Sequence, residues 1–184
     1  MPLRPTDLPA RRRRLLPAAL ALSLIAGAAG CGYRFTPRGG ELPEGVRALQ
    51  VPIFRNLTAE PGIEGIFTDA LRQELARAGR LGGEGADAVA LGAVTEVRDG
   101  AAIYLNSPDG GGGLASIRVE AVATLRLERA GRTLAEVTVR GDEDYIPGAD
   151  SPSILEDEAS RRMALRRLSQ SLMRQAVERL ASGF

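Results

Sequence analysis

The chain has 184 residues, including 24 arginines, 23 acidic residues and one cysteine, and it has no lysine, histidine or tryptophan. Without histidine it cannot build Ser-His-Asp or Cys-His catalytic sites or the usual histidine-containing zinc sites, and one cysteine cannot form an internal disulfide. Five arginines lie in the first 30 residues, so residues 31–184 have 19 basic and 22 acidic residues, a net charge of −3. This balance does not support nucleic-acid binding.

The first 30 residues have the order of a bacterial export signal. Arg11 to Arg14 form a basic region, an almost unbroken apolar stretch runs from Leu15 to Ala29, and Gly30-Cys31 follows. The sequence Ala28-Ala29-Gly30-Cys31 resembles a lipoprotein lipobox, with Ala28 where leucine is usual. The resemblance implies diacylglycerol on the Cys31 thiol, cleavage before Cys31 and acylation of the new amino terminus. We therefore expect a lipoprotein signal peptide over residues 1–30.

Three other interpretations of Cys31 compete with lipidation: a membrane-spanning anchor, a buried structural thiol, and an incidental cysteine beside an ordinary cleavage site. The apolar stretch is shorter than the about 20 residues of a membrane-spanning helix and contains Pro17, and position 31 lies outside any core pattern. Cleavage by ordinary signal peptidase beside an incidental cysteine remains the main alternative. Gly32 favours sorting to the outer membrane, since Asp at that position favours inner-membrane retention in many bacteria.

Residues 31–45 are expected to be a lipidated N-terminus and tether, because prolines and glycines are frequent over residues 36–45. A single domain is expected over residues 46–184. It begins with a strand over residues 46–54, in which Leu49, Val51 and Ile53 alternate. Pro52 places this strand at a sheet edge or marks where its pairing ends.

A helix is predicted over residues 63–78, between Pro61-Gly62 and a C-terminal cap at Gly79. A second strand follows over residues 89–97. In this strand one face is expected to carry Val89, Leu91, Ala93, Thr95 and Val97.

Asn106 to Gly113 is predicted to be a loop, and its four consecutive glycines were considered as a phosphate cradle. No helix pattern follows them and no Lys or Ser/Thr stands at P-loop spacing, so this interpretation is rejected.

Residues 115–128 predict the clearest strand, with alternating apolar residues from Ile117 to Leu127 on one face and charged or polar ones on the other. Ala130-Gly131 predicts a tight turn into a returning strand over residues 132–140, with Ala135, Val137 and Val139 on one face.

The last helix is predicted to begin at Ser153, which has capping-box spacing with Glu156. Asp157–Arg161 and Glu158–Arg162 are predicted four-residue ion pairs. The expected apolar stripe comprises Leu155, Ala159, Leu165, Leu168, Leu172, Ala176 and Leu180. The fold class is therefore α/β: a two-layer sandwich with two helices packed on one face of a mixed sheet of about four strands.

No enzymatic site, cofactor or metal site is predicted. Asp142-Glu143-Asp144 is the densest carboxylate cluster and was considered as a Ca²⁺ site or an acid–base pair. Three consecutive residues near a strand end point in different directions, so a solvated charge run is the better interpretation.

Several stretches resemble the lipopolysaccharide-assembly lipoproteins of the LptE family, in the order of the family's elements. They are Cys31-Gly32-Tyr33-Arg34-Phe35, Val51-Pro52-Ile53-Phe54-Arg55-Asn56-Leu57-Thr58, Gly62-Ile63-Glu64, Thr68-Asp69-Ala70-Leu71, Glu74-Leu75, Ala86-Asp87, Leu91-Gly92 and Tyr145. The resemblance implies a lipid-anchored protein at the periplasmic face of the outer membrane. Such a protein plugs the outer-membrane β-barrel LptD, helps that barrel assemble and inserts lipopolysaccharide (LPS) into the outer leaflet.

Some family members have basic residues that contact LPS, after the second strand and before the last helix. Here the first region is Tyr104-Leu105-Asn106, and no basic residue lies between Arg140 and Arg161. Those contacts are therefore not transferred. Arg118 and Arg126, on the non-core face of the third strand, are instead the candidates for contact with phosphate or with barrel carboxylates, the alternative being ordinary surface arginines.

Two other functions are consistent with the same sequence. Curli-secretion-like lipoproteins and cell-wall-synthase activators also resemble the Val-Pro-Ile-Phe stretch and the Thr-Asp-Ala-Leu helix. A lipid-anchored hydrolase that uses Asp142 or Asp144 is the third possibility.

Overall fold

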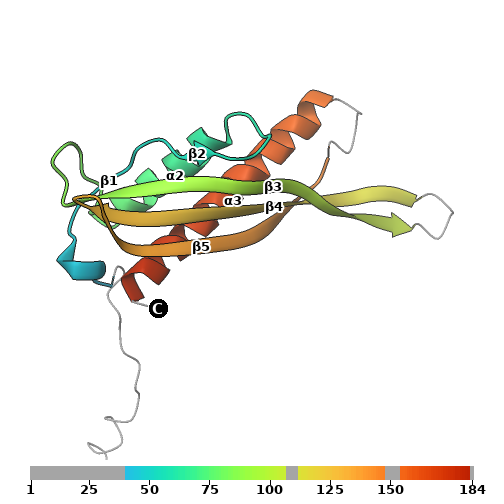
Figure 1. The fold of residues 1–184 in the computed structure, drawn as a ribbon. Coiled ribbons are helices and arrows are strands. Elements are labelled where there is room, and N and C mark those ends of the chain that lie inside the picture. Colours follow the sequence, from blue (N-terminus) through green and yellow to red (C-terminus); the bar gives the residue numbers. More distant parts are fainter. Residues whose placement is uncertain (1–39, 107–111, 148–153, 183–184) are drawn as a thin grey trace, which may run out of the picture. The chain divides into compact units, whose positions relative to one another are not determined.

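The computed structural model describes residues 40–106, 112–147 and 154–182 (Figure 1). Cys31, the predicted signal peptide, the middle of the predicted loop at residues 107–111 and Ser153 lie outside the described residues. The elements are the short helix η3 (Pro43–Gly45), β1 (Leu49–Gln50), β2 (Arg55–Asn56), α2 (Ile63–Arg77), β3 (Ala88–Asn106), β4 (Gly112–Arg129), β5 (Arg132–Tyr145) and α3 (Ile154–Ser182).

The predicted order of strands and helices is confirmed, and the sheet is mixed with five strands. Its order is β1-β3-β4-β5, and β2 also pairs with β3. β1 and β2 run parallel to β3, whereas β3, β4 and β5 are antiparallel neighbours. The fifth strand arises because the predicted first strand is divided in two.

Pro52 lies at that division, as the sequence predicted for the end of pairing. Leu49 pairs with Ala88 before it, and Arg55 pairs with Ala93 after it. The prediction that Ile53 shares a face with Leu49 and Val51 is wrong. Ile53 is 66% exposed, and Phe54 is buried in its place, because the chain leaves regular strand geometry at the proline.

β3 differs from its prediction in two ways. Its pairing register shifts between Val94 and Glu96, so Val97 packs against the core instead of sharing a face with Val89 and Leu91. The strand also continues to Asn106, which pairs with Gly112. The described ends of the predicted loop are therefore strand residues.

β4 and β5 follow the predicted alternation. The buried residues of β4 are Val119, Ala121, Ala123, Leu125 and Leu127, and those of β5 include Val137, Val139 and Tyr145. Ala130 and Gly131 both have positive φ, 49° and 76°, which is typical of a two-residue type I′ hairpin turn.

Both helices lie over the same face of the sheet and complete the core (Figure 1). The predicted stripe of α3 is buried from Leu165 onward, but Leu155 is 81% exposed and Ala159 is also exposed. The first turns of α3 extend past α2, so nothing from α2 covers them. No helix in the described part of the chain is long and apolar enough to cross a membrane.

The packed part of the chain includes residues from the predicted tether. Leu42 belongs to the core and is buried. Glu44 binds Arg132, and this contact holds the segment beside the β4–β5 turn.

Candidate functional site

The face of the sheet opposite the helices carries both predicted site residues, Arg118 and Arg126. We call it the open face; its polar residues in the described part of the chain are Glu96, Arg98, Arg118, Glu120, Thr124, Arg126, Glu128, Glu136, Thr138, Arg140, Asp142 and Asp144, and it also carries the half-buried apolar residues Val89, Leu91, Ala93 and Val122. Strand alternation places these residues together because the core takes the intervening positions.

Arg118 lies at the centre of an ion-pair cluster on the open face. Its guanidinium donates hydrogen bonds of 2.8 and 3.1 Å to the two Asp144 carboxylate oxygens, and its Nε lies 3.3 Å from Asp142 Oδ2. The hydrogen bond from Arg118 lowers the pKa of Asp144, and the same bond raises the pKa of Arg118. Arg118 is therefore held in one orientation by two carboxylates.

Two further arginines of the open face are paired with acids. Arg98 binds Glu120 at 2.7 Å and lies 3.2 Å from Glu96, and Arg126 lies 2.9 Å from Glu128. The hydrogen bond to Glu120 raises the pKa of Arg98. Arg98 was not predicted as a site residue, although its outward position follows from the alternation of β3 beyond the bulge.

Arg118 and Arg126, the two predicted site residues, thus lie on the open face as expected, but the structure does not bring them together at a single point. Seven residues separate them along β4, and Glu120, Val122 and Thr124 occupy the positions between them on the open face. The open face has four arginines and six carboxylates among the described residues. It is a mixed, hydrogen-bonding surface and not a concentrated site for phosphate.

The acidic run at the end of β5 divides between the two faces of the sheet. Asp142 and Asp144 contact Arg118 on the open face, whereas Glu143 points to the helix side and binds Arg167 at 2.6 Å. The prediction that the three carboxylates point in different directions is therefore right for Glu143 and wrong for Asp142 and Asp144, which share the open face. The described residues include no group of three side chains that could hold a metal ion.

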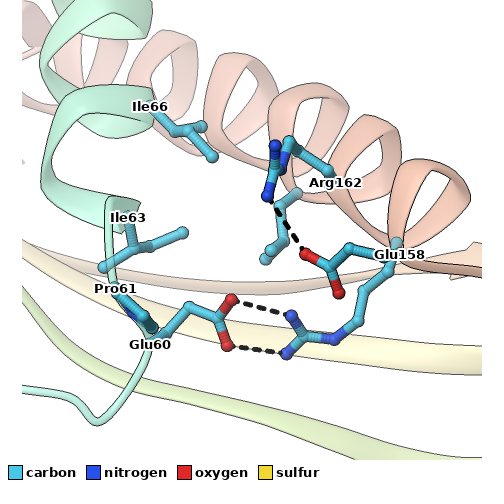
Figure 2. A pocket seen from close by; sticks show the side chains of 8 residues that line it. Glu60, Pro61, Ile63, Ile66, Glu158 and Arg162 are labelled. Atoms are coloured by element: carbon cyan, nitrogen blue, oxygen red, sulfur yellow. Dashed lines mark hydrogen bonds and ion pairs between the residues drawn. The ribbon is translucent and has the colours of Figure 1, made fainter. Parts of the chain in front are cut away.

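A second charged cluster lies on the helix side, around a pocket of about 330 Å³ (Figure 2). Arg161 of α3 binds both oxygens of Glu60 at 2.9 and 3.0 Å and also binds Asp99 of β3 at 3.0 Å. The Arg161 side chain is only 16% exposed, and its pKa is raised mainly by the hydrogen bond to Glu60.

The sequence did not predict that Arg161 joins α3 to Glu60 and to Asp99 of β3. It indicated only a solvated helix pair of Arg161 with Asp157. The neighbouring prediction is confirmed: Arg162 lies 3.2 Å from Glu158. The floor of the pocket is apolar, with Ile63, Ile66 and Leu165, and its arginines are already bound to carboxylates. The cluster therefore joins three segments of the fold and leaves no unpaired arginine for a ligand.

Similar solved structures include a putative lipoprotein from Caulobacter crescentus, with 17% identity, 71% of this chain and 89% of that chain covered, and a TM-score of 0.49. The PelC dodecamer from Paraburkholderia phytofirmans has 18% identity, covers 77% and 93%, and has a TM-score of 0.48. The rare lipoprotein B from Shewanella oneidensis has 12% identity, covers 73% and 92%, and has a TM-score of 0.40.

These TM-scores are below 0.5, so the structural likeness adds no weight to a functional assignment. No curated protein matches the sequence significantly. The sequence model of the family described as "LptE: Lipopolysaccharide-assembly" matches residues 46–180, which is most of the chain. The chain therefore belongs to the LptE family of lipopolysaccharide-assembly proteins.

Proposed function

We propose that this protein is an outer-membrane lipoprotein that plugs the LptD barrel, helps the barrel to assemble and takes part in inserting LPS into the outer leaflet. Membership of the LptE family supports a role in LPS assembly. The lipobox at Ala28 to Cys31 supports lipid anchoring at the periplasmic face of the outer membrane. In this role the protein acts by binding and positioning, without catalysis.

The observation that carries the plug proposal is the character of the open face. Both helices cover the other side of the sheet, and paired charges and hydroxyl groups run along the open face on β4, β5 and the second half of β3. The lumen of an outer-membrane barrel is polar, so a plug must present a hydrated, hydrogen-bonding surface to it. The open face meets that requirement along β4, β5 and the second half of β3, whereas Val89, Leu91 and Ala93 make the first half of β3 more apolar.

Arg118 and Arg126 are proposed to contact the barrel wall. Each is already paired with a carboxylate, so each offers its remaining N–H donors and not a free positive charge. Such contacts fit neutral acceptors and carboxylates of the barrel better than the clustered phosphates of LPS.

Co-purification with the cognate LptD barrel tests this proposal. The lipidated protein, expressed with LptD and extracted with a mild detergent, should recover folded barrel. The double variant Arg118→Glu/Arg126→Glu should recover several-fold less, because it places two more acids on a surface that already has an excess of them.

Arg166→Glu/Arg174→Glu is the matched control. Both residues are exposed on α3 and make no ion pair in the described part of the chain. The control should recover barrel as the unmodified protein does. If the control lost the barrel and the open-face variant retained it, the helices would be the contact surface. If the unmodified protein recovered only periplasmic proteins, the plug proposal itself would fail.

A further inference from the structure

β5 is the edge strand of the sheet on the side away from β1 (Figure 1). In the described part of the chain no strand pairs with its outer side. β5 has 14 residues and no proline, and its pairing with β4 is regular from Ala135 to Tyr145. Natural edge strands are usually short, or interrupted by a proline or a bulge, because their free N–H and C=O groups can pair with another strand. β5 therefore offers a regular edge to which a further strand can be added.

Two charged residues of this edge strand have no ionic partner. Glu136 and Arg140 are exposed on the open face and form no ion pair in the described part of the chain. The other charged residues that β3, β4 and β5 place on the open face all form ion pairs. Even Arg126, which lies opposite Glu136 on β4, binds Glu128 instead. The unpaired charges of these strands are thus confined to the edge, one of each sign.

Glu136 and Arg140 lie two residues on either side of Thr138 and on the same face of the sheet. When two copies of one strand pair antiparallel about a central residue, that residue meets its own copy, and each position before it meets the equivalent position after it. Pairing of β5 with β5 of a second copy about Thr138 places Glu136 of each copy opposite Arg140 of the other. Opposite charges at such positions stabilise a strand pair.

The helix-side residues of β5 match in the same register. Val137 meets Val139 of the second copy, and both valines are buried in the core, so the apolar layer under the helices continues from one copy to the other. Arg179 of α3 donates to the Thr138 carbonyl oxygen at 3.1 Å. A carbonyl oxygen has two lone pairs, so this contact leaves Thr138 able to accept a bond from a paired strand.

Other registers that keep the same faces together use the charges less well. Moving the centre one residue toward the C-terminus places Glu136 opposite Asp142, and moving it two residues brings the two Arg140 side chains together. Moving it three residues brings Arg140 to Asp142, which already contacts Arg118, and leaves Glu136 unpaired. One residue toward the N-terminus, neither charge meets an opposite one. Thr138 is therefore the centre at which both unpaired charges find a partner.

We propose that β5 is a self-pairing edge, through which two copies of this chain associate about a two-fold axis at Thr138. The five strands of each copy then form one continuous sheet, and the helices of both copies lie on the same side of it. The inference goes beyond the proposed plug function, because it concerns the edge of the sheet and a second copy of the chain, whereas the plug uses the open face and the barrel.

A cysteine at the proposed axis tests the register. Residues opposite each other in an antiparallel pair have Cα atoms about 4.5–5.5 Å apart, which is within the range of a disulfide. The lipidated Thr138→Cys variant, oxidised with diamide in mild detergent, should give a covalent dimer on a non-reducing gel. Thr95→Cys is the matched control, at an exposed threonine of β3, and should stay at the background of the unmodified protein. Equal cross-linking of the two variants, or of neither, would overturn the proposal.

Charge reversal tests the two ion pairs. Two copies with different affinity tags are expressed together and recovered through one tag. Arg140→Glu in both copies should reduce recovery of the second copy at least several-fold, because acids then face acids, and Glu136→Arg in both copies should do the same with arginines. Glu136→Arg in one copy and Arg140→Glu in the other restore opposite charges at both contacts, so recovery should return. Both positions are exposed, so thermal unfolding should be the same for each variant.

The mixed pair decides between the proposal and a general effect of charge. If the mixed pair recovered no more of the second copy than the single-variant pairs, the self-pairing of β5 would be wrong. Cross-linking of Thr138→Cys to a different protein would identify a foreign strand as the occupant and would also overturn the proposal. None of these measurements involves LptD, so their outcome is independent of the plug proposal.

Discussion

The ring of Phe54 fills the space that a side chain at Gly92 would occupy. A Cβ built on Gly92 would overlap the Cζ and Cε atoms of the ring, and Phe54 is buried. The Phe54 backbone N–H donates to Thr68 Oγ1 at 2.9 Å, and its ring lies 6.3 Å from that of Phe67. Phe54 thus joins the divided edge strand, β3 and α2 at one point. Phe54 and Gly92 lie in two of the stretches that resemble the LptE family, Val51 to Thr58 and Leu91-Gly92. Their contact gives a physical reason for a phenylalanine in the first stretch and a glycine in the second.

Replacing Gly92 with alanine should destabilise the domain by about 1–3 kcal/mol, because the added methyl group displaces a ring packed on every side. Urea unfolding followed by circular dichroism measures the change in the free energy of unfolding. The double variant Gly92→Ala/Phe54→Leu should lose less than the sum of the two single changes, since the smaller side chain makes room for the methyl group.

Gly65→Ala is the matched control for that experiment. Gly65 lies within α2, and a Cβ there would meet no atom within 4 Å. Alanine has the higher helix propensity, so this variant should be about 0.5–1 kcal/mol more stable than the unmodified protein. Equal destabilisation by both changes would show that Gly92 is not limited by the Phe54 ring.

Replacing Arg161 with glutamine should also destabilise the domain. The change leaves Glu60 and Asp99 without their shared partner at a mostly covered position. We expect a loss of about 1–3 kcal/mol, between the values for an exposed ion pair and for a fully buried one. Arg162→Gln, which removes only the exposed pair with Glu158, should change the free energy of unfolding by less than about 0.5 kcal/mol. If the two variants lost equal stability, Arg161 would not have the joining role.

Much of the fold could be predicted because its signals are local. The alternation of β4 and the helical spacing of α2 depend only on which residues are apolar, and both elements form where expected. The errors occur where non-local geometry decides. The bulge at Val94 reverses the face of Val97, and the position of α2 along α3 decides that Leu155 is exposed while Leu165 is buried.

The same distinction holds for the candidate site. The outward positions of Arg118 and Arg126 follow from alternation along one strand. Their partners do not, since Asp144 is brought opposite Arg118 by the register of β5, and that register depends on the whole hairpin. The bond between Arg161 and Glu60 could not be predicted from helical spacing, because Glu60 is 101 residues away in the chain.

The pH dependence of stability should include a contribution from Asp87. Its carboxylate accepts hydrogen bonds from the backbone N–H groups of Arg47 at 2.8 Å and Ala48 at 3.2 Å, and these bonds lower its pKa below the ordinary 3.8. The ionised form therefore stabilises the folded state above about pH 3.8, and this stabilisation is lost as the pH falls through the lower, folded-state pKa.

Asp87→Asn should thus reduce stability at pH 7 and make the decline between pH 4 and pH 2 less steep. Thermal unfolding in a series of buffers measures both effects. Asp69→Asn, at an exposed position on α2, serves as the control and should follow the unmodified protein. An Asp87→Asn profile parallel to that of the unmodified protein would contradict the role of this carboxylate.

Replacing Cys31 with serine should change the location of the protein more than its fold. The described domain has its own core, which begins at Leu42, so we expect its stability not to depend on a lipid. The variant has no thiol for diacylglycerol, so it should be lost from the outer-membrane fraction while its thermal unfolding in solution stays the same. Gly32→Asp keeps the thiol and should move the lipidated protein toward the inner membrane. Outer-membrane retention of the Cys31→Ser variant would favour cleavage by ordinary signal peptidase, with the barrel alone holding the protein in place.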